Sequence, residues 1–191
     1  MAIGMLLGLA WGGSAQAAGL YQFDQRHGTV SFAVDHMGLF TSRGNFGRFT
    51  GTLRFDLDHP EATQVEVDIA SGSVAIASQD ALAMLRSADY FDVVRHADIR
   101  FRSTAVVPLS AGHFSLSGQL ELRGVSRMQV LDVTLTDRHV DAEGNDIADV
   151  VATGKLQRSA FGMLADRNFI DDMVQLRILM RVVLGPAPRG G

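Results

Sequence analysis

The chain has 191 residues, a length that fits a single domain. Hydrophobic residues make up 47% of the chain and charged residues 20%, which is enough for a sizeable core and argues against a disordered protein. The net charge of -4 argues against nucleic-acid binding, because contacts with phosphates need clustered lysine and arginine.

The N-terminal segment is apolar and uncharged. Residues 1–11 form a hydrophobic block, and small residues follow it, with alanines at positions 15 and 17 in the A-x-A pattern of a cleavage site. The block is too short to cross a hydrocarbon core, which needs about 20 residues. We therefore predict a secretory signal peptide over residues 1–17, no transmembrane segment and a periplasmic location. The positive charge that usually precedes such a block is missing, so a short buried helix is the alternative.

Alternating apolar and polar residues predict β-strands along most of the remaining chain. In the segment that begins at Arg48, for example, Phe49, Leu53 and Phe55 share one face. Taken in chain order, the expected strands cover residues 21–24, 29–37, 48–57, 65–69, 99–107, 114–122, 128–135, 150–157 and 174–183.

One segment departs from this pattern. Ser78 fits a helix N-cap, Asp80 is an acid in the first turn, and Leu82 and Leu85 fall three residues apart on one face. These features predict one short helix near residues 78–86.

The predicted elements define one domain over residues 18–184. Residues 137–146 are polar and contain glycine, so we expect a loop there, and residues 185–191 are expected to form a disordered tail. The strand order predicts an all-β fold, an antiparallel lipocalin-like barrel of about eight strands with the short helix packed at its mouth.

Several segments resemble a known family. The run LRSADYFD at residues 85–92 is similar to the LRSxDFFD element of the YceI-like family of bacterial periplasmic lipid-binding proteins. Further segments match that family in the same order, and they are FAVDHMG at 32–38, RGNF at 43–46, FTGTLRFD at 49–56, GQLELRGVS at 118–126 and RSAFG at 158–162. The resemblance covers nearly the whole chain after residue 20.

This resemblance implies a barrel with an elongated apolar cavity that holds a polyisoprenoid or similar long-chain lipid. The residues expected to line that cavity are Phe32, Val34, His36, Phe46, Phe49, Leu53, Phe55, Leu82, Leu85, Phe91, Phe101, Leu120 and Phe161. The alternative is that the aromatic side chains simply fill the core, since a barrel of about eight strands is just wide enough for either arrangement.

Two of the polar residues are candidates for contact with a lipid head group. His36 follows the inward residues Phe32 and Val34 in phase, and Arg86 belongs to the family-like run. For each residue a structural role is the alternative and the more common case: His36 as a hydrogen-bonded histidine, and Arg86 as a tether between the helix and a strand.

Motifs for other chemistry are missing from the sequence. It has no G-x-S-x-G nucleophile motif, no phosphate-binding loop and no cysteine, and its six histidines lack the spacing of metal ligands. We therefore expect no cofactor and no metal.

Three functions are consistent with these patterns. The first is a non-catalytic periplasmic carrier that sequesters a long-chain lipid. The second is an enzyme that acts on a lipid head group through His36 with Asp35 or Arg86. The third is a structural module that pairs through strand edges around a filled interior. We favour the carrier, with a long-chain isoprenoid or similar lipid as its partner. The sequence leaves open whether the protein forms a homodimer.

Overall fold

The computed structural model describes residues 19–55 and 59–186, so the expected signal peptide lies outside the described residues. The strands are β1 (Gly19–Asp24), β2 (Gly28–His36), β3 (Phe40–Phe46), β4 (Phe49–Phe55), β5 (Gln64–Ala70), β6 (Val74–Ile76), β7 (Asp98–Ser110), β8 (His113–Leu122), β9 (Val125–Val140), β10 (Asn145–Gln157) and β11 (Met173–Pro186). The helix α1 (Gln79–Arg86) is accompanied by the 3-10 helices η1 (Pro60–Ala62), η2 (Ser71–Ser73) and η3 (Arg158–Phe161).

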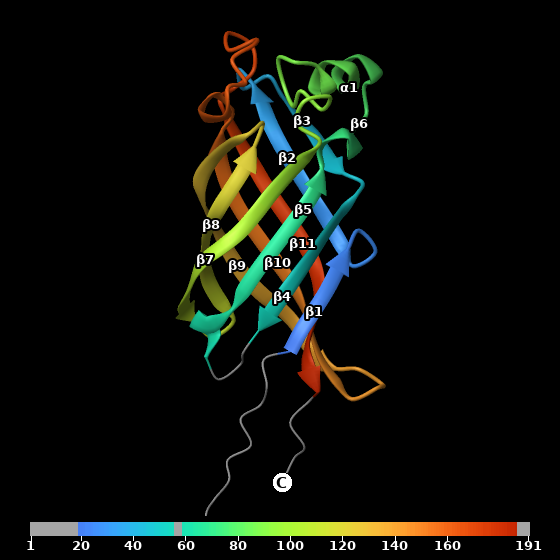
Figure 1. Cartoon of the computed structure of the whole chain (residues 1–191), viewed down its shortest axis with the longest axis vertical. Coiled ribbons are helices and arrows are strands. Elements are labelled where there is room, and N and C mark those ends of the chain that lie inside the picture. Colours follow the sequence, from blue (N-terminus) through green and yellow to red (C-terminus); the bar gives the residue numbers. More distant parts are fainter. Residues whose placement is uncertain (1–18, 56–58, 187–191) are drawn as a thin grey trace, which may run out of the picture.

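All described strands belong to one antiparallel sheet that curls into a barrel (Figure 1). The order of its 11 strands is β1-β4-β5-β7-β8-β9-β10-β11-β2-β3-β6. Residues 25–27 join β1, the first strand in that order, to β2, the ninth, and residues 47–48 join β3, the tenth, to β4, the second. These short links hold the strands near the two edges of the sheet close together, so the sheet has to curl.

The predicted barrel is confirmed, but its 11 strands exceed the expected number of about eight. The strands β3 and β6 were not predicted from the sequence. The residues of β3 are mostly polar or small and show no alternation of large apolar groups, so this segment is a strand because β2 and β6 pair with it. β6 has only 3 residues, too few to show a period.

The expected loop over residues 137–146 is wrong for most of its length. β9 continues to Val140 and β10 begins at Asn145, where pairing between the two strands overrides their polar composition. β11 likewise extends to Pro186, two residues into the segment expected as a tail, and residues 187–191 lie outside the described residues.

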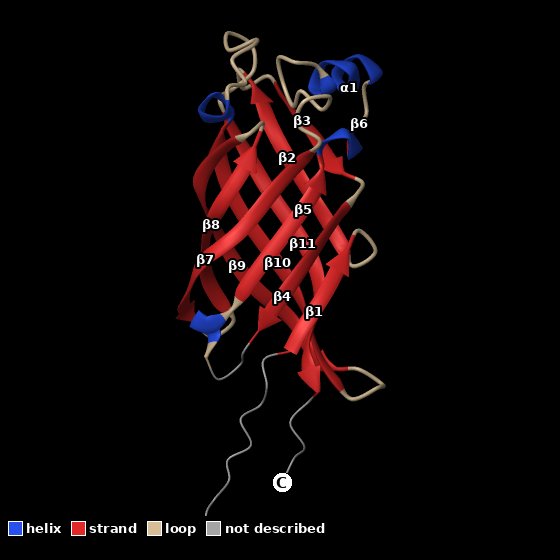
Figure 2. Ribbon diagram, viewed as in Figure 1, coloured by secondary structure: helices blue, strands red, loops and turns tan. Residues whose placement is uncertain are grey.

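The predicted helix is confirmed at one end of the barrel, which we call the helix end (Figure 2). The Ser78 hydroxyl accepts a hydrogen bond from the Ala81 N–H at 3.3 Å and so caps the first turn, as the sequence predicts. The turn between β2 and β3, the segment over residues 87–97 and the loop over residues 162–172 lie at the same end (Figure 1). No helix in the described part of the chain is long and apolar enough to span a membrane.

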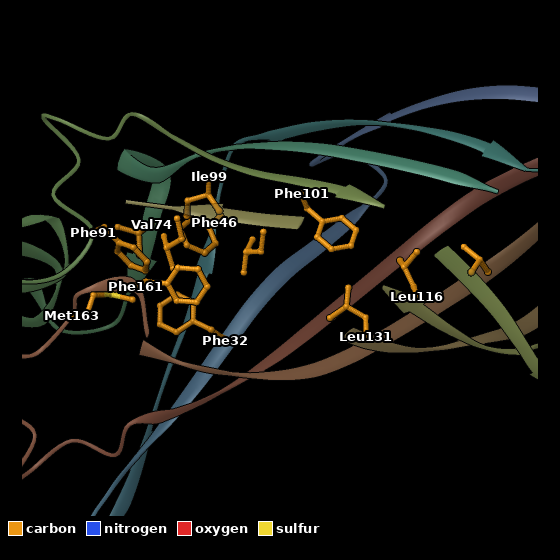
Figure 3. Close-up of a cluster of buried hydrophobic side chains, with 13 residues drawn as sticks. Phe32, Phe46, Val74, Phe91, Ile99, Phe101, Leu116, Leu131, Phe161 and Met163 are labelled. Atoms are coloured by element: carbon orange, nitrogen blue, oxygen red, sulfur yellow. The ribbon is translucent and has the colours of Figure 1, made fainter. Parts of the chain in front are cut away.

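The inner face of the sheet is apolar. One hydrophobic cluster extends from the helix end along the barrel, and in it the rings of Phe32, Phe46 and Phe91 lie 5.5 to 6.2 Å apart between centroids (Figure 3). A second cluster surrounds Phe49 beneath β1 and β4 and the adjoining part of β11.

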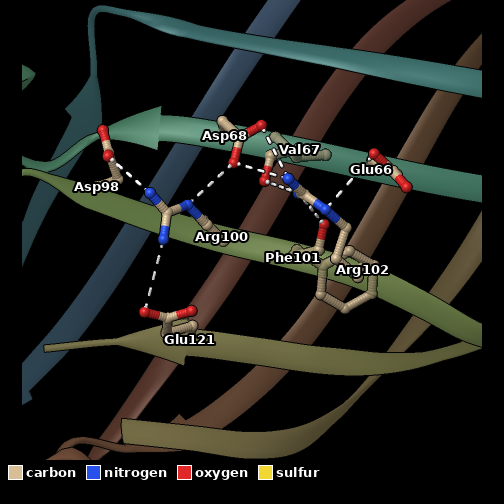
Figure 4. Close-up of polar contacts among 8 residues, drawn as sticks. All are labelled: Glu66, Val67, Asp68, Asp98, Arg100, Phe101, Arg102 and Glu121. Carbon is tan, nitrogen blue, oxygen red and sulfur yellow. Dashed lines mark hydrogen bonds and ion pairs between the residues drawn. The ribbon is translucent and has the colours of Figure 1, made fainter. Parts of the chain in front are cut away.

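The outer face of β5, β7 and β8 is charged (Figure 4). Arg102 donates to both carboxylate oxygens of Asp68 at 3.0 Å, and Arg100 lies between Asp68 and Glu121, at 3.6 and 3.8 Å. The two faces thus follow the alternation that the sequence predicts, and the apolar side chains face the interior.

Candidate ligand cavity

A cavity of about 320 Å³ lies inside the barrel. It reaches from Ala81 and Leu85 of α1 at the helix end to Phe55 and Thr63 near the opposite end. Inward side chains of most strands form its wall, and nearly all of them are aliphatic or aromatic. The volume falls at the lower end of the range for small-molecule sites.

Most of the residues predicted from sequence lie on the cavity wall, which brings together Phe32, Val34, His36, Phe46, Leu53, Phe55, Leu85, Phe91, Phe101 and Leu120. Phe49, Leu82 and Phe161 lie outside the lining. Phe49 is 1% exposed within the second cluster, and Phe161, the last residue of η3, is 3% exposed within the first cluster. Leu82 packs against the first cluster from α1.

His36 lies on the cavity wall near the helix end. Its Nε2 is 2.8 Å from the Ser42 hydroxyl, and its ring stacks on Phe40 with centroids 4.2 Å apart. The neighbouring Asp35 accepts a hydrogen bond from the Thr41 hydroxyl at 2.5 Å and does not line the cavity. His36 therefore has an internal partner, and Asp35 is not positioned to assist it.

Arg86 is not at the cavity. Its guanidinium is exposed and donates to the Gly72 carbonyl at 3.0 Å, which ties α1 to η2. The structure therefore places Arg86 in the tethering role that was the alternative from the sequence, and its contact with a lipid head group stays a prediction.

The cation on the cavity wall is Arg158, which was not among the predicted site residues. Its side chain is 3% exposed and donates to four backbone carbonyls, those of Met163, Ala165, Ile170 and Asp171, at 2.7 to 3.1 Å. These partners hold the loop over residues 162–172 against the barrel. The family-like run RSAFG includes Arg158, but nothing local in that run indicates that its partners come from a loop up to 13 residues away.

Two further contacts fix the same loop. The Tyr90 hydroxyl donates to Asp166 at 2.6 Å, and the Asp171 N–H donates to the Asp35 carbonyl at 2.9 Å. Burial and the hydrogen bond to Asp166 raise the pKa of the Tyr90 phenol above its ordinary value. The phenol therefore stays protonated at neutral pH and keeps its donor role.

The base of the loop is anchored through Asp172. Its carboxylate accepts hydrogen bonds from the Ser159 N–H at 2.9 Å and the Ser159 hydroxyl at 2.6 Å. Burial acts to raise the pKa of Asp172, but the hydrogen bonds from Ser159 and the charges of Arg167 and Arg158 together outweigh it, so the pKa lies below its ordinary value.

Most polar groups on the wall are already hydrogen-bonded. Besides His36, Tyr90 and Arg158, the Gln129 amide donates to the carbonyls of Val130 and Lys155. The Thr63 hydroxyl is the exception among the described residues, because it is buried and has no partner. No cluster of metal-ligating side chains occurs in the described part of the chain. The arrangement suits an apolar chain and offers few free polar groups to a ligand.

Comparisons with known proteins identify the same family as the sequence motifs. The model of the YceI-like domain family matches residues 21–182. A UPF0312 protein of Pectobacterium atrosepticum is 33% identical over 177 residues, which cover 92% of this chain and 91% of that protein. Protein YceI of Salmonella arizonae is 32% identical over 168 residues, 87% of each chain. The resemblance stated from the sequence is thereby confirmed.

Solved structures share the fold. BcnA of Burkholderia cenocepacia superposes with a TM-score of 0.74 at 20% identity, over 83% of this chain and 98% of that one. A polyisoprenoid binding domain from Saccharophagus degradans, implicated in plant cell wall breakdown, gives a TM-score of 0.59 at 13% identity, over 88% of this chain and 99% of that one. At these identities the likeness shows the fold alone.

Replacing Arg158 should destabilise the protein strongly. The substitution Arg158→Met removes the donor from two buried and two half-buried hydrogen bonds to carbonyls, so we expect a loss of about 3 kcal/mol or more in the free energy of unfolding. Arg86→Met, which removes one exposed hydrogen bond, is the matched control and should cost less than about 1 kcal/mol. Urea unfolding followed by circular dichroism measures both, and equal losses would contradict the role of Arg158.

The contribution of Asp172 should depend on pH. Because its pKa is lower in the folded than in the unfolded state, its carboxylate stabilises the fold above the unfolded-state value of about 3.9, and this stabilisation is lost as the pH falls through the folded-state pKa. The wild-type chain should therefore be more stable than Asp172→Asn at neutral pH, and the difference should shrink in acid. Urea titrations of both proteins across this range measure it, and a constant difference contradicts the assignment.

Proposed function

The chain belongs to the YceI-like family, and from this membership together with the cavity we propose that it is a non-catalytic carrier of a polyisoprenoid or other long-chain lipid. The observation that carries the proposal is the apolar cavity of about 320 Å³ along the barrel interior. It argues against a structural module with a filled interior, and it supports a guest that water dissolves poorly.

The energetics favour a long apolar chain. Each buried methylene contributes about 0.8 kcal/mol, whereas association costs about 4 to 15 kcal/mol. A chain of roughly ten carbons therefore gains little net affinity, and a longer one is needed. The solved polyisoprenoid binding domain with the same fold supports this choice of ligand class.

The polar groups near the helix end give little support to the alternative, an enzyme that acts on a lipid head group. Neither proposed partner of His36 is in place, since Asp35 bonds Thr41 and Arg86 bonds Gly72. The hydroxyl of Ser42 lies within reach of His36, but among the described residues no carboxylate lies within hydrogen-bonding distance of the ring to orient it as a base. The geometry therefore favours binding over turnover.

We further propose that the carrier acts in the periplasm. The apolar block and the A-x-A pattern within residues 1–17 support export, and a dry cavity gives an insoluble lipid a route through an aqueous compartment.

The protein should carry an apolar ligand when it is purified under native conditions. Native mass spectrometry of the freshly isolated chain should show an added mass that organic extraction removes and that a polyprenol restores, because the empty cavity leaves apolar wall uncovered. A bound lipid released chemically unchanged supports the carrier. An apo mass that takes up no polyprenol would refute lipid binding, and modification of the added lipid would refute the absence of catalysis.

Export should depend on the N-terminal segment. A C-terminally tagged full chain should appear in the periplasmic fraction, shortened by residues 1–17, whereas a chain that lacks those residues should stay in the cytoplasm. Cell fractionation with mass analysis of the N-terminus distinguishes the two. Recovery of the uncut full chain from the cytoplasm would contradict the proposed location.

A further inference from the structure

Four glycines face the interior of the barrel, and each has a large apolar residue two positions further along its strand. Gly44, Gly51, Gly118 and Gly154 are in phase with the cavity-lining residues of β3, β4, β8 and β10, for example Phe46 beside Gly44 and Leu120 beside Gly118. None of the four has a positive φ, so turn geometry does not explain the absence of a side chain. Each glycine is instead covered by a side chain from an adjacent strand.

Two of the contacts made by aromatic rings join residues directly opposite each other. Phe32 pairs with Gly44 across β2 and β3, and Phe23 pairs with Gly51 across β1 and β4. A methyl group on either glycine would overlap the Cζ atom of the paired ring. The rings therefore lie over the glycines and against the wall.

The third contact is diagonal. Gly118 of β8 lies opposite Ser103, two residues from Phe101, and a methyl group on Gly118 would lie 2.5 Å from Phe101 Cζ. Leu131 is the direct partner of Gly154 across β9 and β10 and covers this glycine, with its Cδ2 at 2.6 Å from such a methyl group. Ordinary contacts between carbon atoms are about 3.5 to 4.0 Å, so none of these positions accepts a methyl group without movement.

We propose that the three pairs Phe23–Gly51, Phe32–Gly44 and Phe101–Gly118 set the bore of the cavity and thereby select the cross-section of the chain that it accepts. Phe23, Phe32 and Phe101 all line the cavity. Each ring borders the cavity, so a side chain at the glycine that displaces the ring toward the open space narrows the bore. In this arrangement each ring covers the backbone of a glycine on the barrel wall. The ring therefore does not project into the cavity, and the cavity stays open.

The inference rests on the proposed lipid-binding function and adds a selection rule to it. A chain with methyl branches, such as a prenyl chain, is wider than a straight alkyl chain of the same length. Narrowing the bore should therefore weaken binding of the branched chain first, because a tight apolar wall penalises each extra methyl group.

The test compares Gly44→Ala with the wild type, using geranylgeraniol and the straight-chain alcohol of equal length as probes in displacement of an apolar fluorophore. Gly44 is chosen because, of the three atoms nearest to its methyl group, two belong to the Phe32 ring, at 2.4 and 2.9 Å, and the third is the carbonyl oxygen of Ala75 in the short strand β6, at 2.9 Å. We expect the affinity ratio of branched to straight alcohol to fall about tenfold. Adding Phe32→Leu to Gly44→Ala should restore the ratio.

The matched control is Gly72→Ala, since a methyl group on Gly72 meets nothing within 4 Å, and its ratio should equal that of the wild type. Equal losses for both alcohols in folded Gly44→Ala, or an unchanged ratio, overturn the proposal. If Gly44→Ala does not fold, Phe101→Leu decides, because removing that ring should raise the ratio, and an unchanged ratio again overturns the proposal.

A crystal structure of Gly44→Ala separates this inference from the proposed function. The Phe32 ring should move from the wall into the cavity and reduce its volume, whether or not lipid is bound. A ring that stays in place overturns the role of the pair. If the wild type binds neither alcohol, the proposed lipid-binding function is refuted. The position of the Phe32 ring in Gly44→Ala still shows whether the ring and glycine pair sets the width of the cavity.

Discussion

Short covalent links hold the two ends of the sheet together, and the rest of the structure depends on this constraint. Residues 25–27 and 47–48 hold the strands near the two edges of the sheet close together, so the sheet has to curl around its apolar face. Hydrogen bonds between neighbouring strands then fix the spacing of the wall. Because the strand spacing is fixed, the wall cannot contract around the inward side chains. A cavity is left where side chains from opposite sides of the barrel do not touch.

The helix end of this hollow is built from polar groups that bind one another. At the helix end, backbone carbonyls rather than carboxylates surround the buried guanidinium of Arg158, and Tyr90 and Asp172 fix the same loop. In these contacts buried polar groups hydrogen-bond to one another, since leaving a buried polar group unpaired costs free energy of folding. The cavity wall is thereby left to aliphatic and aromatic side chains, which is the property on which the proposed function rests.

The fate of individual predictions shows which features are local. The helix was predictable because Ser78, Asp80 and the leucines at 82 and 85 lie within one short segment, and its cap needs no distant partner. Arg86 and Arg158 could not be told apart in this way. Both stand in family-like runs, but the one is exposed beside Gly72 and the other is buried among carbonyls from residues 163–171.

The sequence by itself determined the all-β class, the inward phase of most strands, the single capped helix and the family. Each follows from residue period, from a local cap or from an ordered set of motifs. The tertiary structure alone decided that β3 and β6 are strands, which residues border the hollow, and that rings such as Phe32 cover glycines such as Gly44. Those features depend on strand register and on the curl of the sheet, which join residues far apart in the chain and leave no mark in any single segment.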